Sequence, residues 1–387
     1  MVYDVAIIGA GPAGGSAAVH CAKKGLKVLV LEEHASIGEP VHCGECLSDF
    51  ALENTGLIIP DEVISEKVDG VRVVFPDGYS PILYEKGMVL EKHLFEQYLV
   101  NLAEGKGAVV RLGARVEKMT KNADWTIEHS KGEDKAKLVI DASGVQSVSS
   151  RMLGLQQRFK TVVGMQYELQ DIPRDGFLDF YLWPELAPHG YLWMIPKKNG
   201  RANVGLVTNQ NNKAKPFLDE FIKRMKWEGK KSVKTFGGLI PASGPLQKTV
   251  SDGLILIGDA AGFTSPMFEG GTHLSLKSGE YASQIAKKAI DSHNTSVSVL
   301  GEYQYLWSKE FPNYDKLVKG KDLLYSFSDE ELNQIGRTLP MNLSKMGLLG
   351  KANVGLKLLM QNKKLIDKGA IDALMTFSYS QAKYYGW

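Results

Sequence analysis

VAIIGAGPAGGSAAVHCAKKGLKVLVLE, from Val5 to Glu32, is the stretch of sequence that decides the fold. Its first four residues are apolar and a glycine-rich turn follows them. The segment from Ser16 to Lys24 suits a helix, and the segment from Val28 to Leu31 is again apolar. A strand, a helix and a second strand within about 30 residues form the unit that connects two parallel strands. The pattern therefore predicts an α/β protein with a parallel sheet that begins at the N-terminus.

The glycines of this turn, Gly9, Gly11 and Gly14, have the spacing of a dinucleotide-binding fingerprint. In such a unit the first glycine makes the turn and the second lets a pyrophosphate approach the backbone. The third lets the helix and the strand pack closely. We expect this loop, which also contains Pro12 and Ala13, to hold phosphates at the N-terminus of the helix. The alternative is a glycine-rich turn that binds no ligand.

Two further segments extend the expected site. Glu32, at the end of the second strand, is the acid expected to accept hydrogen bonds from a ribose. Far along the chain, the segment Gly258 to Gly262 follows an apolar run, and Gly270 and Gly271 precede a predicted helix. This segment looks like the stretch of FAD enzymes that binds the flavin. The alternative is a core strand that is followed by a polar loop. The chain has no second GxGxxG, so we expect FAD and no separate NAD(P)H domain.

Composition excludes several classes of protein. The chain has 387 residues, with 46 Lys and Arg against 44 Asp and Glu, which gives a net charge of +2. This balance argues against a nucleic-acid partner, and 44% hydrophobic residues are typical of an ordinary globular protein. Three cysteines exclude a disulfide framework and favour a cytoplasmic location. The sequence begins without a signal peptide, and it has no apolar window of the length that crosses a bilayer.

Five stretches give the chain a resemblance to a known family: Gly9 to Gly15, Pro40 to Ser48, Asp141 to Arg151, Gly190 to Pro196 and Gly258 to Gly279. The sequence resembles the geranylgeranyl reductase family of flavoproteins, whose fold is similar to that of para-hydroxybenzoate hydroxylase. The second and fourth stretches carry the motifs PxxCGE and YxWxxP, which are particular to prenyl-chain reductases. The resemblance implies an α/β (α+β) fold with a Rossmann-like FAD-binding domain, an antiparallel-sheet substrate domain and a helical C-terminal region.

The same resemblance implies a reaction and its ligands. Members of the family saturate isolated double bonds of geranylgeranyl chains, in archaea on digeranylgeranylglycerophospholipids, and the short chain favours this archaeal type. They use FAD and an external electron donor, which we expect to be ferredoxin-like or NAD(P)H. Carried onto this sequence, the family pattern implies cofactor contacts by Cys43, Gly44, Lys92, Gly144, Asp259, Gly270 and Gly271.

Four residues depart from the family pattern. Lys92 stands where relatives usually carry Arg, which weakens a bidentate phosphate contact. Cys46 stands where relatives tend to have Gly or Ala. Glu269 and His273 stand where relatives have small or apolar residues. We therefore expect the chemistry near the flavin to be tuned differently in this chain.

Reduction of an isolated alkene needs a hydride, which a reduced flavin supplies, and a proton donor near the bond. Cys43 and His273 are the candidates for that donor. Three interpretations of Cys43 stay open: a residue at the flavin face, half of a redox pair with Cys46, or an ordinary core cysteine. His273 equally fits a structural histidine. We expect no metal site, since Cys21 lies in the first helix and one CxxC cannot supply four ligands.

Aromatic residues alternate along two predicted strands, at Tyr181 and Trp183 and again at Tyr191 and Trp193. Alternate side chains of a strand share one face. We therefore expect these four residues, with Pro196 at the end of the YxWxxP motif, to line an apolar tunnel for an isoprenoid chain. The alternative is that they belong to an ordinary core.

The predicted elements divide the chain into three parts. We expect a discontinuous FAD-binding domain from residues 1–68, 90–158 and 240–305, an antiparallel-sheet substrate domain from residues 69–89 and 159–239, and a helical region over residues 306–387.

Two segments concentrate positive charge. Residues 213–234 carry eight Lys or Arg against three acids, and residues 345–368 carry six lysines against one acid. Solvated faces explain both segments by default. The second segment also contains many Leu, Met and Val residues, as an interfacial membrane helix does. Contact with the inner face of a membrane is therefore a second interpretation of residues 345–368.

Other functions fit parts of the same pattern. A flavin monooxygenase or halogenase shares the fold and would consume NAD(P)H and O2. An electron-transfer flavoprotein that reduces a quinone would have to lack an iron–sulfur cluster, because three cysteines cannot supply four thiolates. An FAD-binding scaffold without catalytic activity is a further alternative.

Overall fold

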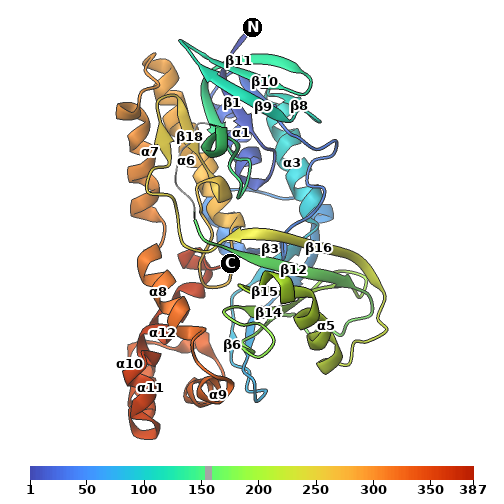
Figure 1. Ribbon diagram of the computed structural model, residues 1–387, viewed down its shortest axis with the longest axis vertical. Coiled ribbons are helices and arrows are strands. Elements are labelled where there is room, and N and C mark those ends of the chain that lie inside the picture. The colour runs from blue at the N-terminus through green and yellow to red at the C-terminus, as the bar shows by residue number, and fades with distance from the viewer. Residues whose placement is uncertain (153–158) are drawn as a thin grey trace.

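A parallel sheet, an antiparallel sheet and a column of helices make up the protein, whose computed structural model describes residues 1–152 and 159–387 (Figure 1). The first sheet has the strand order β17-β18-β11-β1-β2-β8, and β10 and β9 extend it beside β11. The run from β18 to β8 is parallel, as the N-terminal unit predicts. The strands of this sheet are β1 (Val2–Ile8), β2 (Val28–Leu31), β8 (Val109–Arg111), β9 (Val116–Lys121), β10 (Trp125–His129), β11 (Gly132–Asp141), β17 (Val250–Ser251) and β18 (Leu254–Leu256).

The last residues of four strands of the parallel sheet pair with one another, so these strands end at the same level. Ile8 pairs with Leu31 on one side and with Asp141 on the other, and Asp141 pairs with Leu256. The loops that follow these strands therefore meet at one edge of the sheet. Ligands of open α/β sheets bind outside this carboxyl edge.

The second sheet is mainly antiparallel, and it forms the lower right part of the molecule in Figure 1. Its strands, in spatial order, are β16 (Ser232–Pro241), β12 (Thr161–Leu169), β15 (Ala202–Thr208), β14 (Tyr191–Pro196), β13 (Phe177–Tyr181), β5 (Gly70–Val74) and β6 (Ile82–Leu83). A small third sheet consists of β3 (Cys46–Ser48), β7 (Gly87–Leu90) and β4 (Ile64–Val68).

The helices form two groups: most lie beside the parallel sheet or in a column along one side of the molecule, and Ala214–Arg224 packs on the antiparallel sheet (Figure 1). They are α1 (Pro12–Lys23), α2 (Asp49–Thr55), α3 (Lys92–Glu104), α4 (Val148–Met152), α5 (Ala214–Arg224), α6 (Thr272–Asp291), α7 (Val297–Glu310), α8 (Tyr314–Leu324), α9 (Asp329–Thr338), α10 (Leu348–Gln361), α11 (Lys363–Asp367) and α12 (Ala370–Phe377). The hydroxyl of Ser16 on α1 donates to the carbonyl of Leu276 on α6 at 2.7 Å. The chain end at Trp387 lies back in the middle of the molecule, where the indole donates to Glu85 at 3.1 Å.

The topology confirms the predicted fold class. Between β8 and β9 the chain turns at Gly113, where φ is +64°. Residues 345–368, considered above as an interfacial helix, contain two helices, α10 and α11, because the side chain of Asn362 accepts the N–H of Lys364 and caps α11. Such a local hydrogen bond competes with a continuous helix.

The division into domains stays a prediction, and its boundary at residue 158 lies outside the described residues. Within the two described ranges, every helix is too short or too polar to cross a bilayer.

Candidate active site

The loop after β1 has the tight geometry that the glycine spacing predicts. Gly9 has a φ of +95°, and a Cβ on this residue would lie 2.5 Å from the carbonyl oxygen of Ala142. A Cβ on Gly14 would lie 1.9 Å from the carbonyl oxygen of Gly9. A Cβ on Gly11 would meet no atom within 4 Å, so the space in front of the α1 N-terminus is open. A phosphate group fits this cradle, where the helix dipole and free N–H groups favour an anion.

Glu32 lies directly beside this loop. Its Oε2 accepts the N–H of Ala10 at 2.9 Å, and its Oε1 accepts the N–H of His34 at 2.9 Å. The carboxylate is therefore fixed at the end of β2, next to the phosphate cradle. This is the position in which an acid binds the ribose of a dinucleotide.

The second predicted segment reaches the same edge of the sheet. Asp259 lies in a 3-10 turn, Gly258–Ala260, after β18, and accepts a hydrogen bond from the Thr264 hydroxyl at 3.3 Å. Burial raises the pKa of the Asp259 carboxyl, although Lys92 and Thr264 lower it. Gly271 lies beside this carboxyl, since a Cβ on it would be 3.5 Å from the Asp259 Oδ1. The cradle, Glu32 and this segment thus lie together at the carboxyl edge of the parallel sheet, and their residue types fit a dinucleotide.

Lys92 begins α3 and is buried on the same side. Its ammonium donates to Glu96, and its backbone N–H donates to the Glu45 Oε1 at 3.0 Å. Burial alone would lower the pKa of the Lys92 ammonium, but Glu96 and the neighbouring Cys43 raise it above its usual value. A permanent positive charge therefore lies next to Cys43 and Asp259.

Gly144 lies within a serine-rich turn that the sequence reasoning did not explain. Asp141, at the end of β11, accepts the N–H of Ser143 at 2.9 Å, the hydroxyl of Ser147 at 2.8 Å and the N–H of Ser149 at 2.9 Å. The Asp141 carboxylate therefore fixes the turn in which Gly144 has a φ of +77°. An aspartate followed by several serines is the only sequence signal for this arrangement.

Glu45, within the PxxCGE motif, is the centre of a buried ionic cluster. Its Oε2 accepts hydrogen bonds from the Lys197 ammonium and from the Asn203 amide, both at 2.6 Å. The side chains of Glu45 and Lys197 are each only 2% exposed. Lys197 also lies 3.2 Å from Glu91 and 3.7 Å from Glu168, to both of which Arg201 is paired. The loop with Cys43 is thereby tied to β15 and to the end of β14.

Part of this cluster is held ionised by its neighbours. Burial alone would raise the pKa of the Glu91 carboxyl, but the Ser65 hydroxyl, Lys197 and Arg201 lower it to about 2. The Glu91 carboxylate therefore keeps its charge near neutral pH.

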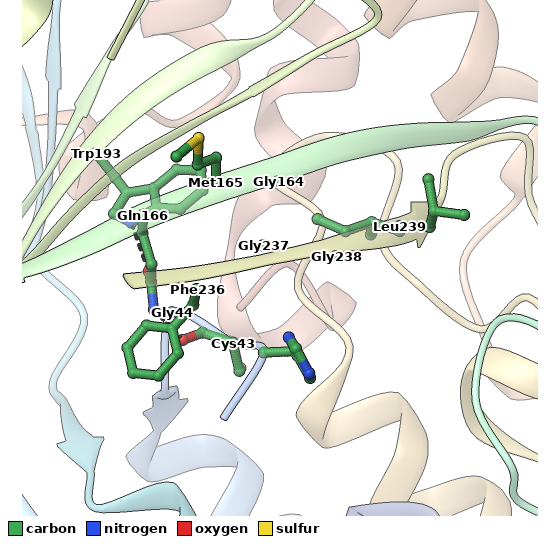
Figure 2. A pocket seen from close by; sticks show the side chains of 12 residues that line it. Cys43, Gly44, Gly164, Met165, Gln166, Trp193, Phe236, Gly237, Gly238 and Leu239 are labelled. Atoms are coloured by element: carbon green, nitrogen blue, oxygen red, sulfur yellow. Dashed lines mark hydrogen bonds between the residues drawn. The ribbon is translucent and has the colours of Figure 1, made fainter. Parts of the chain in front are cut away.

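A single glutamine connects the two motifs that distinguish this chain. The Trp193 indole donates to the Gln166 Oε1 at 3.1 Å, and the Gln166 amide donates to the carbonyl oxygen of Cys43 at 2.8 Å. Figure 2 shows Trp193, Gln166 and Cys43 in this order, from the sheet down to the loop. Gln166 lies on β12 outside both motifs, and sequence reasoning missed it because nothing local marks it.

These residues form one side of an apolar pocket of about 60 Å³ (Figure 2). The other side is β16, which contributes Phe236, Gly237, Gly238, Leu239 and Ile240. Gly44 lies close to the sheet, because a Cβ on it would be 2.9 Å from the Ile195 Cδ1. The pocket therefore joins the Cys43 loop to the aromatic face of the second sheet.

The prediction that four aromatic residues share one face is wrong. Phe180 pairs with Trp193 across β13 and β14, whereas Tyr181 pairs with Leu192. Because side chains alternate along a strand, Tyr181 and Trp193 point to opposite faces. Tyr181 and Trp183 pack on Phe221 of α5, with ring centroids 5.0 and 5.6 Å away.

The other two aromatic residues, Tyr191 and Trp193, lie on the opposite face of the sheet. Tyr191 lies beside Trp193, with ring centroids 5.7 Å apart, and Phe180 completes this face in the place expected for Tyr181. Pro196, at the end of β14, is buried and pairs with Ala202 rather than lining the pocket. Phe180, Tyr191 and Trp193 thus form one aromatic face, and of the three it is Trp193 that lines the pocket.

Of the two predicted proton donors, Cys43 is half-buried at the pocket and His273 is buried, and both are neutral near pH 7. Burial raises the pKa of the Cys43 thiol, which accepts the N–H of Glu45 at 3.2 Å, and the sulfurs of Cys43 and Cys46 are not bonded. Burial lowers the pKa of the His273 imidazole to about 3. In the described part of the chain neither ring nitrogen of His273 has a hydrogen-bond partner, and its ring lies 4.3 Å from that of Tyr385.

Comparison with known proteins gives consistent matches along the chain. Residues 4–319 match the family model described as lycopene cyclase protein. Digeranylgeranylglycerophospholipid reductase 2 of Methanococcoides burtonii is 35% identical over 390 residues, which cover 94% of each chain. Digeranylgeranylglycerophospholipid reductase of Methanocaldococcus jannaschii is 34% identical over 370 residues, which cover 90% of this chain and 93% of that protein.

Solved structures match over nearly the whole chain. A geranylgeranyl bacteriochlorophyll reductase-like protein from Thermoplasma acidophilum matches with a TM-score of 0.86 at 29% identity, over 95% of this chain and 98% of that one. The halogenase PltM in complex with phloroglucinol and FAD matches with a TM-score of 0.71 at 19% identity, over 97% and 86% of the two chains. The second likeness shows a flavoprotein fold.

Replacement of Lys197 by Met is expected to destabilise the protein strongly, since it leaves the buried Glu45 carboxylate without its counter-ion. We expect a loss of about 3–5 kcal/mol in the free energy of unfolding, measured by urea denaturation. Lys215→Met is the matched control, because the Lys215–Asp219 pair is exposed and is worth about 0.3–0.5 kcal/mol. Equal losses in the two variants would contradict a central role for Lys197.

Proposed function

The chain belongs to the digeranylgeranylglycerophospholipid reductase family, and from this membership we propose that it saturates the double bonds of geranylgeranyl chains in a membrane glycerophospholipid. The protein is an oxidoreductase of flavoprotein fold. One observation of this chain carries the proposal: the hydrogen-bond path from Trp193 through Gln166 to Cys43. It joins the two prenyl-reductase motifs at the wall of one apolar pocket.

FAD is the cofactor of this proposal. Gly9, Gly11 and Gly14 with Pro12 and Ala13 would hold its pyrophosphate, Glu32 its ribose, and Asp259, Gly270 and Gly271 the end that carries the flavin. When bound and reduced, FAD supplies a hydride. An external donor, ferredoxin-like or NAD(P)H, would reduce it.

The remaining tasks fall to the side chains of the protein. The apolar pocket and the aromatic face of Phe180, Tyr191 and Trp193 bind an isoprenoid chain by burying its surface. The same surface excludes water from the reacting bond. Gln166 fixes the Cys43 loop, so that the isoprenoid chain takes the same position relative to the cofactor in each turnover.

The proposal predicts a yellow protein that saturates geranylgeranyl lipid. Enzyme reduced with dithionite under anaerobic conditions is expected to add two hydrogen atoms per double bond to digeranylgeranylglycerophospholipid, as measured by mass spectrometry. A lipid of unchanged mass would contradict the proposal. An oxygenated product formed with NAD(P)H and O2 would favour a monooxygenase, and reduction of a quinone without lipid saturation would favour an electron-transfer flavoprotein.

Cys43 is placed by this proposal at the flavin side of the pocket. Cys43→Ala is expected to lower kcat/KM for the lipid by roughly tenfold or more, because a gap in the pocket wall misplaces the substrate. FAD content, measured by absorbance, should stay unchanged. Cys46→Ala separates the interpretations: a redox pair requires both cysteines, whereas a contact at the flavin face leaves the Cys46 variant active.

We further propose that the end of the helical column contacts the membrane that contains the substrate. Apolar side chains of α10 and α12 are exposed there, with Leu359 52% and Met360 78% exposed. Lys357, Lys363 and Lys364 are exposed close to them in sequence. Apolar and basic side chains together favour an anionic lipid surface, to which each lysine adds about 1 kcal/mol.

Acidic substitutions of the exposed apolar residues at this end of the column test the membrane contact. Leu359→Glu combined with Met360→Glu is expected to weaken binding to vesicles of phosphatidylglycerol and phosphatidylcholine by about tenfold or more, since each buried side chain is worth about 1.5–3 kcal/mol. Tyr305→Glu, at an exposed aromatic residue of α7, is the control. Equal sedimentation of all three proteins with the vesicles would contradict the proposed surface.

A further inference from the structure

One carboxyl group next to the site has no part in the machinery described above. Glu269 lies between Phe268 and Gly270, in the segment that leads into α6. Its backbone φ of +48° is in the left-handed region, which is unfavourable for a residue with a β carbon. Such a conformation persists only where the surrounding structure imposes it. The contacts of this segment therefore decide the position of the Glu269 carboxyl.

Two tyrosine hydroxyls hold the backbone just before Glu269. Tyr325, which follows α8, donates to the carbonyl oxygen of Met267 at 2.9 Å. Tyr191 of β14 donates to the carbonyl oxygen of Phe268 at 2.7 Å. Burial raises the pKa of both hydroxyls well above the usual value, so they remain protonated donors. The segment is thus fixed from the helical column and from the antiparallel sheet at the same time.

The ring of Phe268 packs against the aromatic face formed by Phe180, Tyr191 and Trp193. It stacks on Phe180 with ring centroids 4.9 Å apart and planes 10° apart, and it contacts Tyr191 edge-on at 5.0 Å. On the other side of Glu269, Gly270 begins the glycine pair assigned above to the flavin end of FAD. Glu269 therefore stands at the junction of the aromatic face and the cofactor segment.

The state of this carboxyl suits proton donation. Its Oε2 is buried and lacks a hydrogen-bond partner among the described residues. Burial raises the pKa of the Glu269 carboxyl to about 8, although Lys321 and Tyr191 act to lower it. At neutral pH the group is therefore mainly an uncharged carboxylic acid, which interacts with Tyr191 and keeps one oxygen without a hydrogen-bond partner among the described residues.

The other candidate donors match the task less well. A general acid is most effective when its pKa lies near the working pH. Burial raises the pKa of the Cys43 thiol further above its usual value of 9.0, and it lowers that of His273 to about 3. Of these three groups, only Glu269 has a pKa near neutrality, and its unpartnered Oε2 lies in the segment between the Phe268 ring and Gly270.

We propose that the Glu269 carboxyl is the proton donor in alkene reduction, a step that rests on the proposed function. The π bond of the alkene breaks, and one carbon forms a C–H bond with the hydride and its electron pair, which come from reduced flavin. The other carbon forms a C–H bond with the proton of Glu269. The alkene is reduced by two electrons, the flavin is oxidised by two, and the carboxylate regains its proton from water.

The first test compares Glu269→Gln and Glu269→Asp with the wild type and with Glu302→Gln, a control at an exposed residue of α7. The Gln variant keeps the shape of the side chain but has no acidic proton, so its rate of lipid saturation is expected to fall about 10²-fold or more. FAD binding and flavin reduction should be unchanged. The wild-type rate should fall as pH rises through about 8, because the carboxyl then loses its proton. The Asp variant should recover part of the rate, and the control should match the wild type.

The second test does not depend on activity. Infrared difference spectra of the FAD-loaded wild type and the Gln variant should show the carbonyl band of a protonated carboxylic acid at pH 7. This band should disappear from the difference spectrum as pH rises through about 8.

The outcomes separate the two proposals. A wild type that leaves the lipid unchanged overturns the proposed function and with it this step. If the wild type is active and the Gln variant saturates the lipid within threefold of the wild-type rate, only the assignment of Glu269 is overturned. The assignment of Glu269 is equally overturned if the band is missing at pH 7. If the Gln variant does not fold, the pH profile and the Asp variant decide.

Discussion

The position of the loop that carries Cys43 depends on the Glu45 carboxylate, which joins helix α3 to the antiparallel sheet. One oxygen of Glu45 binds the Lys92 N–H at the start of α3, and the other binds Lys197 and Asn203 of the antiparallel sheet. Removing these charges from water costs several kcal/mol for each ion, and only close, well-oriented partners offset that cost. The cluster is therefore weak as a source of stability and strong as a determinant of position, since any shift of the loop would leave a charge unpaired.

The site depends on a second set of contacts that is uncharged. The phenols of Tyr191 and Tyr325 hold the carbonyls before Glu269, as Gln166 holds the carbonyl of Cys43. In each case a neutral side chain of one element fixes the backbone of another, and the apolar surface between them stays intact. A hydrophobic substrate and a polar cofactor can thus bind side by side without exposed charges on the substrate face.

Local sequence was sufficient for the parts of the structure that depend on neighbouring residues. The turn at Gly9 and the acid at Glu32 each need only a few adjacent residues, and both are present. The parallel sheet and the fold class follow from the same unit and from the strand pattern. The assignment of FAD, by contrast, depends on the fit of these residues to a dinucleotide and on the fold.

The contacts that position the site could not be predicted from the sequence, because they join residues that are far apart along the chain. Lys197 is 152 residues from Glu45, and Gln166 is 123 residues from Cys43, with no spacing rule to connect them. The aromatic face was assigned to Tyr181 instead of Phe180 because pairing between β13 and β14 decides it, and a shift of one residue reverses every side chain. The protonation of Glu269 depends on burial, which only the folded chain reveals.

The pocket between the two motifs has walls of unequal stiffness. Its inner wall is tied through Gln166 and the Glu45 cluster, whereas its outer wall is β16, the end strand of the antiparallel sheet over the described residues. An end strand is held by a ladder on one side, so it moves at a lower free-energy cost than a central strand. The width of the pocket can therefore change by displacement of β16 alone. Under the proposed function, a stiff prenyl chain with many double bonds and a flexible, nearly saturated one would occupy the same site in turn, with the reacting bond held against the fixed wall.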